Sequence, residues 1–245
     1  DRAYHSNHSD EFGVEGNATI NGKQVMKRVQ DERDRFAGFA LKSVDSWDEN
    51  NKIYGRAVFS ESGLIEAHTA EGDTQYIKAD HIIIATGSKP FVPEGWKLSL
   101  GDTLLTSDTI FELPDLPKSM AVVGAGAIGL ELAQAMSRLG VEVVIFNRNN
   151  IVGGLRDEEI NQKAIACFSN ELDLRLNTTI DSVTRDESGD TPQAVIHYTD
   201  ADGKAQTWRG EKVLAATGRR NTLHTLGLEH VGVELDKSNR PLNFN

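Results

Sequence analysis

Apolar residues recur at helical spacing along the first part of the chain, from Val25 to Val44, and charged residues fill most of the positions between them. A period near 3.6 residues is typical of an amphipathic helix, so the pattern predicts a long helix over residues 23–46. Asn21 and Gln24, three positions apart, form a capping-box pattern at its start. We therefore expect a capped helix with one apolar face.

A strand-rich stretch follows, because β-branched and aromatic residues alternate with polar ones over residues 52–78. Its last two segments flank Glu71-Gly72-Asp73, which predicts a hairpin. The run from Ile82 to Ala85 is continuously apolar and leads into Thr-Gly-Ser. A run of this kind predicts a buried strand that enters a sharp turn.

Prolines gather near the middle of the chain, where "FELPDLPKS" carries Pro114 and Pro117. Proline and turn-forming residues interrupt regular structure, so this stretch is interpreted as a linker. A domain boundary is expected near residue 115, dividing the chain into segments 1–114 and 115–245. Beyond the boundary, strands and helices alternate in a way that is typical of an α/β fold.

The second segment opens on "MAVVGAGAIG", an apolar strand that runs into three glycines and then into a helix. In a dinucleotide-binding turn, Gly124 permits the tight turn, Gly126 lets a pyrophosphate approach the backbone, and Gly129 lets the helix pack close to the strand. Unpaired amides at the helix start add donors and partial positive charge. The alternative is a glycine-rich turn without a ligand; a P-loop is excluded because its Gly-Lys-Ser/Thr is absent from the sequence.

The next strand, "VEVVIF", ends where this fold usually presents an acid to the 2′-hydroxyl of the adenosine ribose. Asn147 and Arg148 stand there instead. Asn147 can hydrogen-bond a hydroxyl and has no charge to repel a 2′-phosphate, whereas Arg148 can form charge-assisted bonds to that phosphate, with Arg156 as a second candidate donor. The pattern favours NADP(H) or no strong preference, and a solvated surface arginine is the alternative.

The acidic composition narrows the classes of function. The 245 residues include 37 acidic and 26 basic ones, a net charge of −11, which argues against broad binding of nucleic acid or anionic lipid. No apolar run approaches the ~20 residues of a membrane span, and no signal-peptide core is seen, so we expect a cytoplasmic protein without membrane attachment. The single cysteine, Cys167, lies on the apolar face of a helix that Asp157 caps, and is interpreted as a buried structural thiol.

Three stretches carry a resemblance when they are taken together in this order and spacing: "HIIIATGSKP", "LTSDTIFELPDLPKSMAVVGAGAIGLELAQAMSRLG" and "KVLAATGRRN". They resemble the flavin-dependent pyridine nucleotide–disulfide oxidoreductases, and dihydrolipoamide dehydrogenases are the members that they resemble most. The similarity covers nearly the whole chain. It implies an α/β fold in which a Rossmann-type NAD(P)-binding domain, a parallel sheet plus a β-meander, occupies 115–245 after an incomplete FAD-binding segment of helix and strands in 1–114.

The sequence also departs from that family. Members are longer; they open with a GxGxxG that holds FAD and a CxxxxC redox pair, and they end in a dimerisation domain, none of which this sequence contains. We therefore expect an internal fragment of a homodimeric parent, which would move hydride between NAD(P)H and FAD and then serve a disulfide or dithiol substrate. With Cys167 as the single thiol, the chain alone is expected to be inactive on disulfides and to lack stable FAD.

The resemblance also assigns residues to the dinucleotide. Dehydrogenases of the family usually carry an acid where Asn147 stands, whereas NADPH-specific reductases carry an arginine at the position of Arg148. The residues at these two positions favour NADP(H), whereas the dehydrogenases that the sequence resembles most favour NAD(H). The pyrophosphate is implied to lie on Gly124, Gly126 and Gly129 and on the amides of Ala127 and Ile128.

Further residues are implied to meet the nicotinamide and the flavin. Glu131 would help to position the nicotinamide, the alternative being an exposed polar residue of the helix. Gly218 would lie beside the nicotinamide ribose, where Arg219 either assists or is a surface charge. The segment of Ala85, Thr86 and Gly87 is implied to pass near FAD.

Two other functions stay open at this point. One is a transhydrogenase or NAD(P)H oxidase of the same architecture, without dithiol chemistry. The other is a non-catalytic module, either nucleotide-binding or an interaction module. No metal site is expected, because the histidines are scattered and no set of Cys, His and acidic residues has zinc-ligand spacing.

Overall fold

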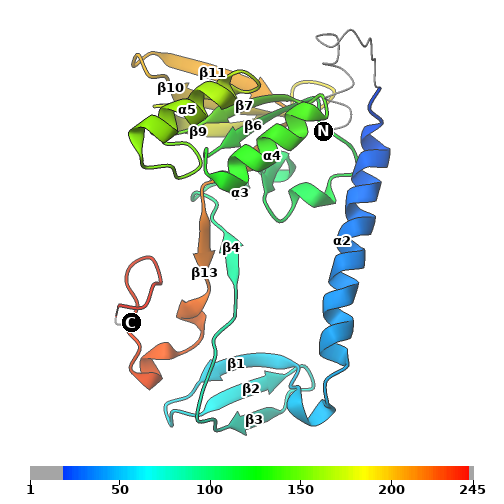
Figure 1. Ribbon diagram of the computed structural model, residues 1–245, viewed down its shortest axis with the longest axis vertical. Coiled ribbons are helices and arrows are strands. Elements are labelled where there is room, and N and C mark those ends of the chain that lie inside the picture. The colour runs from blue at the N-terminus through cyan, green and yellow to red at the C-terminus, as the bar shows by residue number, and fades with distance from the viewer. Residues whose placement is uncertain (1–18, 243–245) are drawn as a thin grey trace. The chain divides into compact units, whose positions relative to one another are not determined.

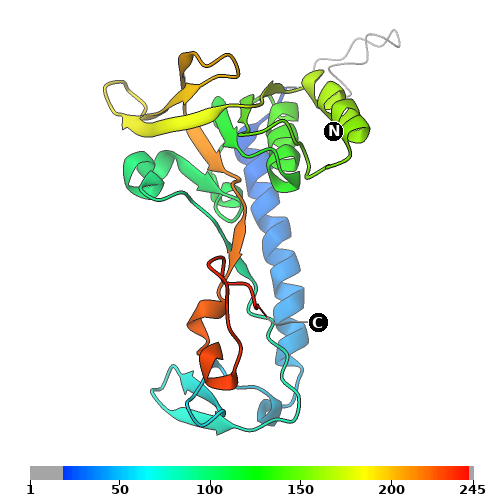
Figure 2. The same ribbon diagram turned by 90° about the vertical axis from the view of Figure 1, so that its left-hand side faces the viewer.

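A computed structural model describes residues 19–242, which divide by their contacts into two compact units (Figures 1 and 2). Unit 1 comprises residues up to Arg33 and Pro90–Gly218, and unit 2 comprises Asp34–Lys89 and the residues from Arg219 onwards. The two compact units therefore have other boundaries than the expected segments 1–114 and 115–245. The assignment of these segments to FAD and to NAD(P) stays a prediction.

Unit 1 is built on a five-stranded sheet in the order β5-β12-β6-β7-β8, in which all neighbouring strands are parallel. The middle strands are buried on both faces, which explains their unbroken apolar sequences. This confirms the expected α/β class with a parallel sheet. The strands are β5 (Leu104–Thr106), β6 (Ser119–Val123), β7 (Glu142–Phe146), β8 (Asp173–Arg175) and β12 (Lys212–Ala215).

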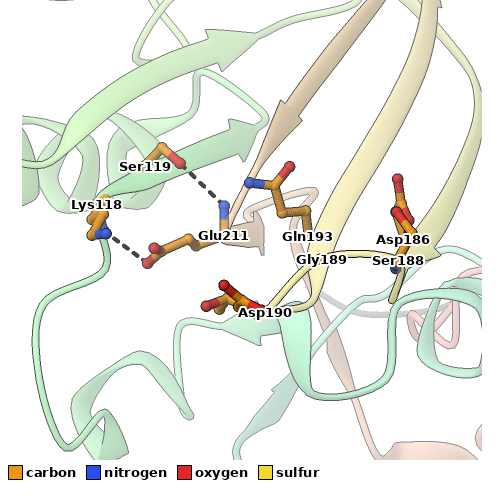
Figure 3. A pocket seen from close by; sticks show the side chains of 9 residues that line it. Lys118, Ser119, Asp186, Ser188, Gly189, Asp190, Gln193 and Glu211 are labelled. Carbon is orange, nitrogen blue, oxygen red and sulfur yellow. Dashed lines mark hydrogen bonds between the residues drawn. The ribbon is translucent and has the colours of Figure 1, made fainter.

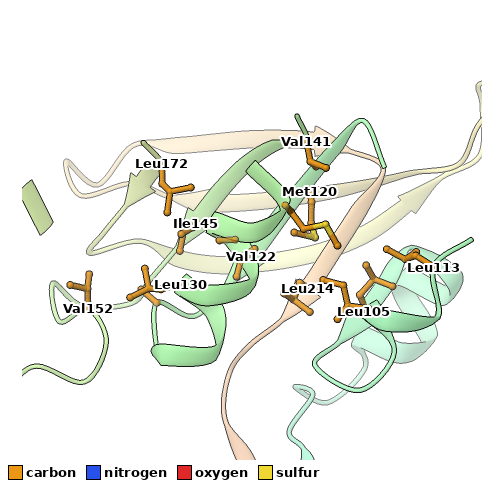
Figure 4. Close-up of a cluster of buried hydrophobic side chains, with 14 of the residues drawn as sticks. Leu105, Leu113, Met120, Val122, Leu130, Val141, Ile145, Val152, Leu172 and Leu214 are labelled. Carbon is orange, nitrogen blue, oxygen red and sulfur yellow. The ribbon is translucent and has the colours of Figure 1, made fainter. Parts of the chain in front are cut away.

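Helices α4 (Ala127–Arg138) and α5 (Glu158–Ser169) pack on one face of this sheet. Side chains alternate along a strand, so Met120 and Val122 of β6 point into the helix-side core shown in Figure 4. Ala121, between them, belongs to the core on the opposite face. The glycine turn between β6 and α4 is therefore fixed at both ends by buried elements.

The opposite face of the sheet is covered by a β-meander and a short helix. The meander has the antiparallel order β11-β10-β9, and buried Ile196 and Tyr198 of β10 share a core with Val144, Phe146 and Val213 of the parallel sheet. Helix α3 adds Leu100 to the same core. The elements are α3 (Trp96–Leu100), β9 (Thr179–Asp186), β10 (Gln193–Thr199) and β11 (Ala205–Gly210).

Helix α2 (Gly22–Asp45) confirms the long N-terminal helix, and the division between the units falls within it. The Gln24 amide donates to Asn21 Oδ1 at 3.1 Å, which is the main-chain half of the expected capping box. Met26 is the one buried residue of α2. Several apolar residues that the helical pattern placed on one face are exposed, among them Phe36 and Val44. Other described residues therefore cover only part of the apolar face of α2.

Unit 2 contains the antiparallel sheet β1-β2-β3, drawn in cyan in Figure 2, and the strand pair β4–β13. The predicted hairpin is confirmed as β2 and β3, and a small core forms around Phe59, Leu226 and Leu228. The strands are β1 (Gly55–Phe59), β2 (Ile65–Thr69), β3 (Thr74–Ile77), β4 (Ser88–Pro90) and β13 (Arg219–Asn221). Its short 3₁₀ turns are η2 (Glu49–Asn51), η5 (Leu223–Thr225) and η6 (Leu228–Val231), whereas η3 (Gly101–Thr103) and η4 (Ile110–Glu112) belong to unit 1.

Two expectations about burial are wrong. Residues 82–85 do not form a buried strand: they have no strand assignment, and Ile83 is 92 % exposed. A continuous apolar strand needs a sheet covered on both faces, and the described part of unit 2 offers none beside this run. Cys167 is exposed rather than buried, because the inward face of α5 is formed by Asn161, Ala164, Ile165 and Phe168, from which Cys167 is turned away.

Candidate functional site

A pocket of about 740 Å³ opens at the carboxyl ends of β6, β7 and β12, within unit 1. Parallel α/β sheets place ligands at this edge, and the volume lies in the range of roughly 300–1,000 Å³ common for ligand sites. The lining joins the glycine turn to apolar and hydroxyl side chains. It consists of Phe91, Pro93, Trp96, Val123, Gly124, Gly126, Phe146, Asn147, Arg148, Thr178, Thr179, Ile180, Ala216, Thr217 and Gly218.

Two glycines of the turn are required by the protein's own geometry. Gly124 has φ +113°, a conformation that side chains disfavour, and a Cβ there would lie 2.4 Å from the carbonyl oxygen of Ala216. A Cβ on Gly129 would lie 2.0 Å from the carbonyl oxygen of Gly124. These two positions therefore need glycine so that the helix can pack against the strand.

Gly126 has no such internal reason to be glycine. Its backbone, at φ −71° and ψ 174°, is open to any residue, and no heavy atom lies within 4 Å of the place where a Cβ would stand. The open space lies at the N-terminus of α4, where the amides of Ala127 and Ile128 have no partner within the helix. An anionic group can approach the backbone here and accept from those amides.

At the end of β7, Asn147 is held by the protein itself. Its Oδ1 accepts from the Ala125 amide at 3.1 Å, and its Nδ2 donates to the carbonyl oxygens of Asn149 and Ile151, each at 3.0 Å. Arg148 is exposed and lines the same pocket. Within residues 19–242 its guanidinium has no ion-pair partner, so Arg148 is a positive charge at the rim that can meet an anionic ligand. Arg156 is exposed in the loop before α5 and is not part of the lining.

The other end of the pocket lies where β12 ends. Gly218 has φ +121° and lines the pocket, and its carbonyl oxygen accepts from the Phe91 amide at 2.9 Å. Thr217 Oγ1 donates to the Phe91 carbonyl oxygen at 2.7 Å. The segment at Phe91 is thereby fixed beside the strand end, and it contributes apolar lining that the sequence motifs did not reveal.

Other residues predicted for the site lie outside the lining of this pocket. Glu131 is an exposed residue of α4. Arg219 belongs to unit 2, where its guanidinium donates to Ser88 Oγ at 2.9 Å and to the Ser88 carbonyl oxygen at 2.7 Å, linking β13 to β4. The segment predicted to pass near FAD is also in unit 2, is exposed, and leads into β4; it consists of Ala85, Thr86 and Gly87.

The sequence patterns also gave no indication that Trp96 of α3 and the segment Thr178–Ile180 line the pocket. Thr178 directly follows the loop after β8, and its amide donates to the Asn147 carbonyl oxygen at 2.9 Å. A search for residues just beyond every predicted strand end could have found Thr178. Trp96 had no local signal, because the packing of α3 against β9 and β5, which are distant in sequence or irregularly connected to it, decides its position.

A second, smaller pocket of about 360 Å³ is lined mainly by polar side chains (Figure 3). Glu211 Oε2 accepts from the Lys118 amide at 2.9 Å, and the Glu211 amide donates to Ser119 Oγ at 3.1 Å. The hydroxyl and amide of Ser188, together with Arg209, lower the pKa of Asp186 to about 2. These contacts join strands and turns of unit 1, so the side chains of Glu211, Ser119 and Asp186 have partners within the protein.

Over residues 19–242, no cluster of three or more His, Cys, Asp or Glu side chains is arranged to hold a metal ion. Across the same residues, every helix is too short or too polar to cross a membrane.

Comparison with known sequences identifies a family. The pyridine nucleotide-disulphide oxidoreductase family matches residues 12–242. A mercuric reductase of Streptomyces lividans is 36 % identical over 184 residues, 74 % of this chain and 37 % of its own length. A dihydrolipoyl dehydrogenase of Cupriavidus necator is 29 % identical over 237 residues, 94 % of this chain and 48 % of its own length. The chain thus spans half or less of the length of these curated relatives.

Solved structures share the fold. LpdA from Mycobacterium tuberculosis superposes with a TM-score of 0.73 at 25 % identity, covering 97 % of this chain and 50 % of that one. The flavoprotein disulfide reductase RclA from Escherichia coli, in its Cu(II) complex, superposes with a TM-score of 0.74 at 19 % identity, covering 98 % and 51 %. Together with the glycine turn and its pocket, these matches establish that the chain belongs to the pyridine nucleotide-disulphide oxidoreductase family.

Proposed function

We propose that unit 1 binds a nicotinamide dinucleotide across the carboxyl ends of β6, β7 and β12. The observation that carries this proposal is Gly126, which is glycine although no part of the described protein requires it. The open space above Gly126 fits a pyrophosphate, which the amides of Ala127 and Ile128 would bind. The nicotinamide half would extend towards Gly218, and the adenosine half towards Arg148.

The proposed cofactor is NADP(H) rather than NAD(H). Arg148 lines the pocket and is the charged residue of its lining. A guanidinium binds a phosphate through charge-assisted bonds but gains little from a ribose hydroxyl. Asn147 beside it is neutral, so this edge lacks the carboxylate that would repel a 2′-phosphate.

For the whole protein we propose a flavin-dependent oxidoreductase of the dihydrolipoamide dehydrogenase type. When bound, the nicotinamide and FAD would supply the hydride and electron transfer, and a redox cysteine pair of the whole protein would serve the disulfide or dithiol substrate. The residues of this chain would bind and orient the nicotinamide nucleotide, with Glu131 near its reactive ring. The segment Ala85–Gly87 is proposed to pass near FAD. The parent is proposed to be a homodimer.

A titration with NADPH and with NADH tests the cofactor proposal. The unchanged chain should bind NADPH more tightly, and Arg148→Glu should lower its affinity for NADPH by roughly tenfold or more, because one charge-assisted bond contributes about 1.5–3 kcal/mol. Arg156→Glu is the matched control, an exposed arginine of the same loop outside the pocket. An equal loss of NADPH and NADH affinity in Arg148→Glu would refute the role of Arg148.

Two alternatives give different results in simple experiments. A non-catalytic module of another kind would bind neither nucleotide. A transhydrogenase or NAD(P)H oxidase would bind NAD(P)H in the same pocket but would oxidise it without a dithiol substrate. We also propose that the isolated chain holds FAD poorly, and a flavin absorbance band near one equivalent in the purified chain would contradict that.

A further inference from the structure

The donor hydrogens of the Asn147 side chain are all engaged within the protein. Its Nδ2 carries two hydrogens and faces three oxygens, namely the Asn149 carbonyl at 3.0 Å, the Asn149 Oδ1 at 3.1 Å and the Ile151 carbonyl at 3.0 Å. Its Oδ1 accepts from the Ala125 amide at 3.1 Å. The side chain therefore bridges the glycine turn to the loop that follows β7.

The partners of Asn147 also define its residue type and orientation. One partner is a donor N–H and the others are carbonyl oxygens, so the amide must point its oxygen at Ala125 and its nitrogen at the loop. An aspartate keeps the acceptor for Ala125 but directs a charge at two carbonyl oxygens. An alanine loses both sides of the bridge. Asparagine is thus the residue that this bridge needs.

The bridge holds the centre of the glycine turn. Ala125 stands between Gly124 and Gly126 and is 1 % exposed. Its amide is bound by Asn147, and its carbonyl oxygen accepts from the Gly153 amide at 2.7 Å. Both polar groups of Ala125 are therefore fixed by the loop 147–153 rather than by the sheet.

The loop is anchored in turn by a buried asparagine of α5. Asn161 is 4 % exposed; its Nδ2 donates to the Asn150 carbonyl oxygen at 2.8 Å, and its Oδ1 accepts from the Val152 amide at 2.9 Å. The two asparagines thus hold the loop from opposite sides. Movement of the loop is coupled through Ala125 to the turn on which a pyrophosphate would lie.

We propose that Asn147 is a positioning residue, which holds the glycine turn in shape through Ala125, and that its amide donates no hydrogen bond to the adenosine ribose. This inference rests on the proposed nucleotide site. It leaves Arg148 as the residue that distinguishes the 2′-phosphate from the 2′-hydroxyl, while Asn147 affects both nucleotides alike.

The test compares Asn147→Ala and Asn147→Asp with the unchanged chain, by titration with NADPH and NADH and by hydrogen exchange at the Ala125 amide. Asn147→Ala should weaken both nucleotides by the same factor, roughly tenfold for a lost hydrogen-bonded bridge, and leave the NADPH-to-NADH ratio unchanged. Asn147→Asp should also weaken both nucleotides, and NADPH more than NADH, because its carboxylate repels the 2′-phosphate. Exchange at Ala125 should be faster in Asn147→Ala. Asn170→Ala is the control, because Asn170 is an exposed residue at the end of α5.

Three results would overturn the proposal: unchanged Ala125 exchange in Asn147→Ala, a change in the nucleotide ratio in that variant, or tighter NADH binding by Asn147→Asp, as expected of a ribose ligand. Should Asn147→Ala not fold, Asn147→Ser carries the nucleotide readouts, since it adds no charge at this edge. If the unchanged chain binds neither nucleotide, the proposed function fails separately, and the exchange comparison still decides whether Asn147 holds the turn.

Discussion

Replacing Gly126 by alanine separates the demands of the fold from those of the ligand. At φ −71° and ψ 174° an alanine is unstrained, and its methyl group would meet no heavy atom within 4 Å. The free energy of unfolding should therefore change by about 1 kcal/mol or less, the size of a helix N-cap preference. A substitution that leaves the free energy of unfolding nearly unchanged but weakens nucleotide binding would therefore act through the ligand.

The expected effect on nucleotide affinity is large. A methyl group at Gly126 would occupy the space through which a pyrophosphate approaches the amides of Ala127 and Ile128. A hydrogen bond to a charged group contributes about 1.5–3 kcal/mol, so the loss of one such bond weakens binding roughly tenfold or more, for NADPH and NADH alike. Urea unfolding measures the stability, and quenching or enhancement of nucleotide fluorescence measures the affinity.

Gly129→Ala is the matched comparison, because its Cβ would lie 2.0 Å from the backbone oxygen of Gly124. Backbone atoms cannot rotate away, so we expect this variant to be destabilised by about 1–3 kcal/mol even without nucleotide. If Gly126→Ala binds NADPH as tightly as the unchanged chain, the pyrophosphate does not lie on this turn. If Gly126→Ala is as unstable as Gly129→Ala, the space above Gly126 is not open.

Three further predictions concern single side chains. Asp157→Ala should lower the free energy of unfolding by about 1 kcal/mol in urea, because Asp157 Oδ1 caps α5 by accepting from the Ile160 amide at 3.0 Å. The pKa of Asp186 is lowered to about 2 by Ser188 and Arg209, so its contribution to stability should be complete above pH 3.8 and lost as the pH falls through about 2; an NMR titration midpoint near 3.8 would contradict this. Cys167 is exposed and should react with a thiol reagent at one equivalent in the native protein, whereas a buried thiol would react only after denaturation.

Local patterns predicted the elements whose signals lie close together in sequence. The turn "GAGAIG" after Ala121–Val123 is an example, because its strand, glycines and helix are consecutive. Helix α2 was expected over 23–46 and is found over Gly22–Asp45, since helical spacing and a cap define it locally. The hairpin β2–β3 follows from its turn residues.

Features that depend on distant parts of the chain were not predictable in this way. Asn161 is polar, so its position on the inward face of α5 becomes intelligible only with the loop that it binds. The helical pattern assigned Cys167 to the apolar face, but the orientation of α5 is decided by what it packs against. Ile83 shows the same limit, because apolar character predicts burial only where another element is present to cover it.

The place of β12 in the sheet has a consequence for folding. β12 lies between β5 and β6, although it is the last of the five strands along the chain. Strands β6, β7 and β8 can pair in the order in which they are synthesised, but β5, which is made first, has β12 as its neighbour in the sheet. Until Lys212–Ala215 has emerged from the ribosome, β5 and one edge of β6 stay unpaired, and open edges of this kind invite association with other chains. Pulse-labelled hydrogen exchange during refolding should therefore find the amides of β5 protected no earlier than those of β12.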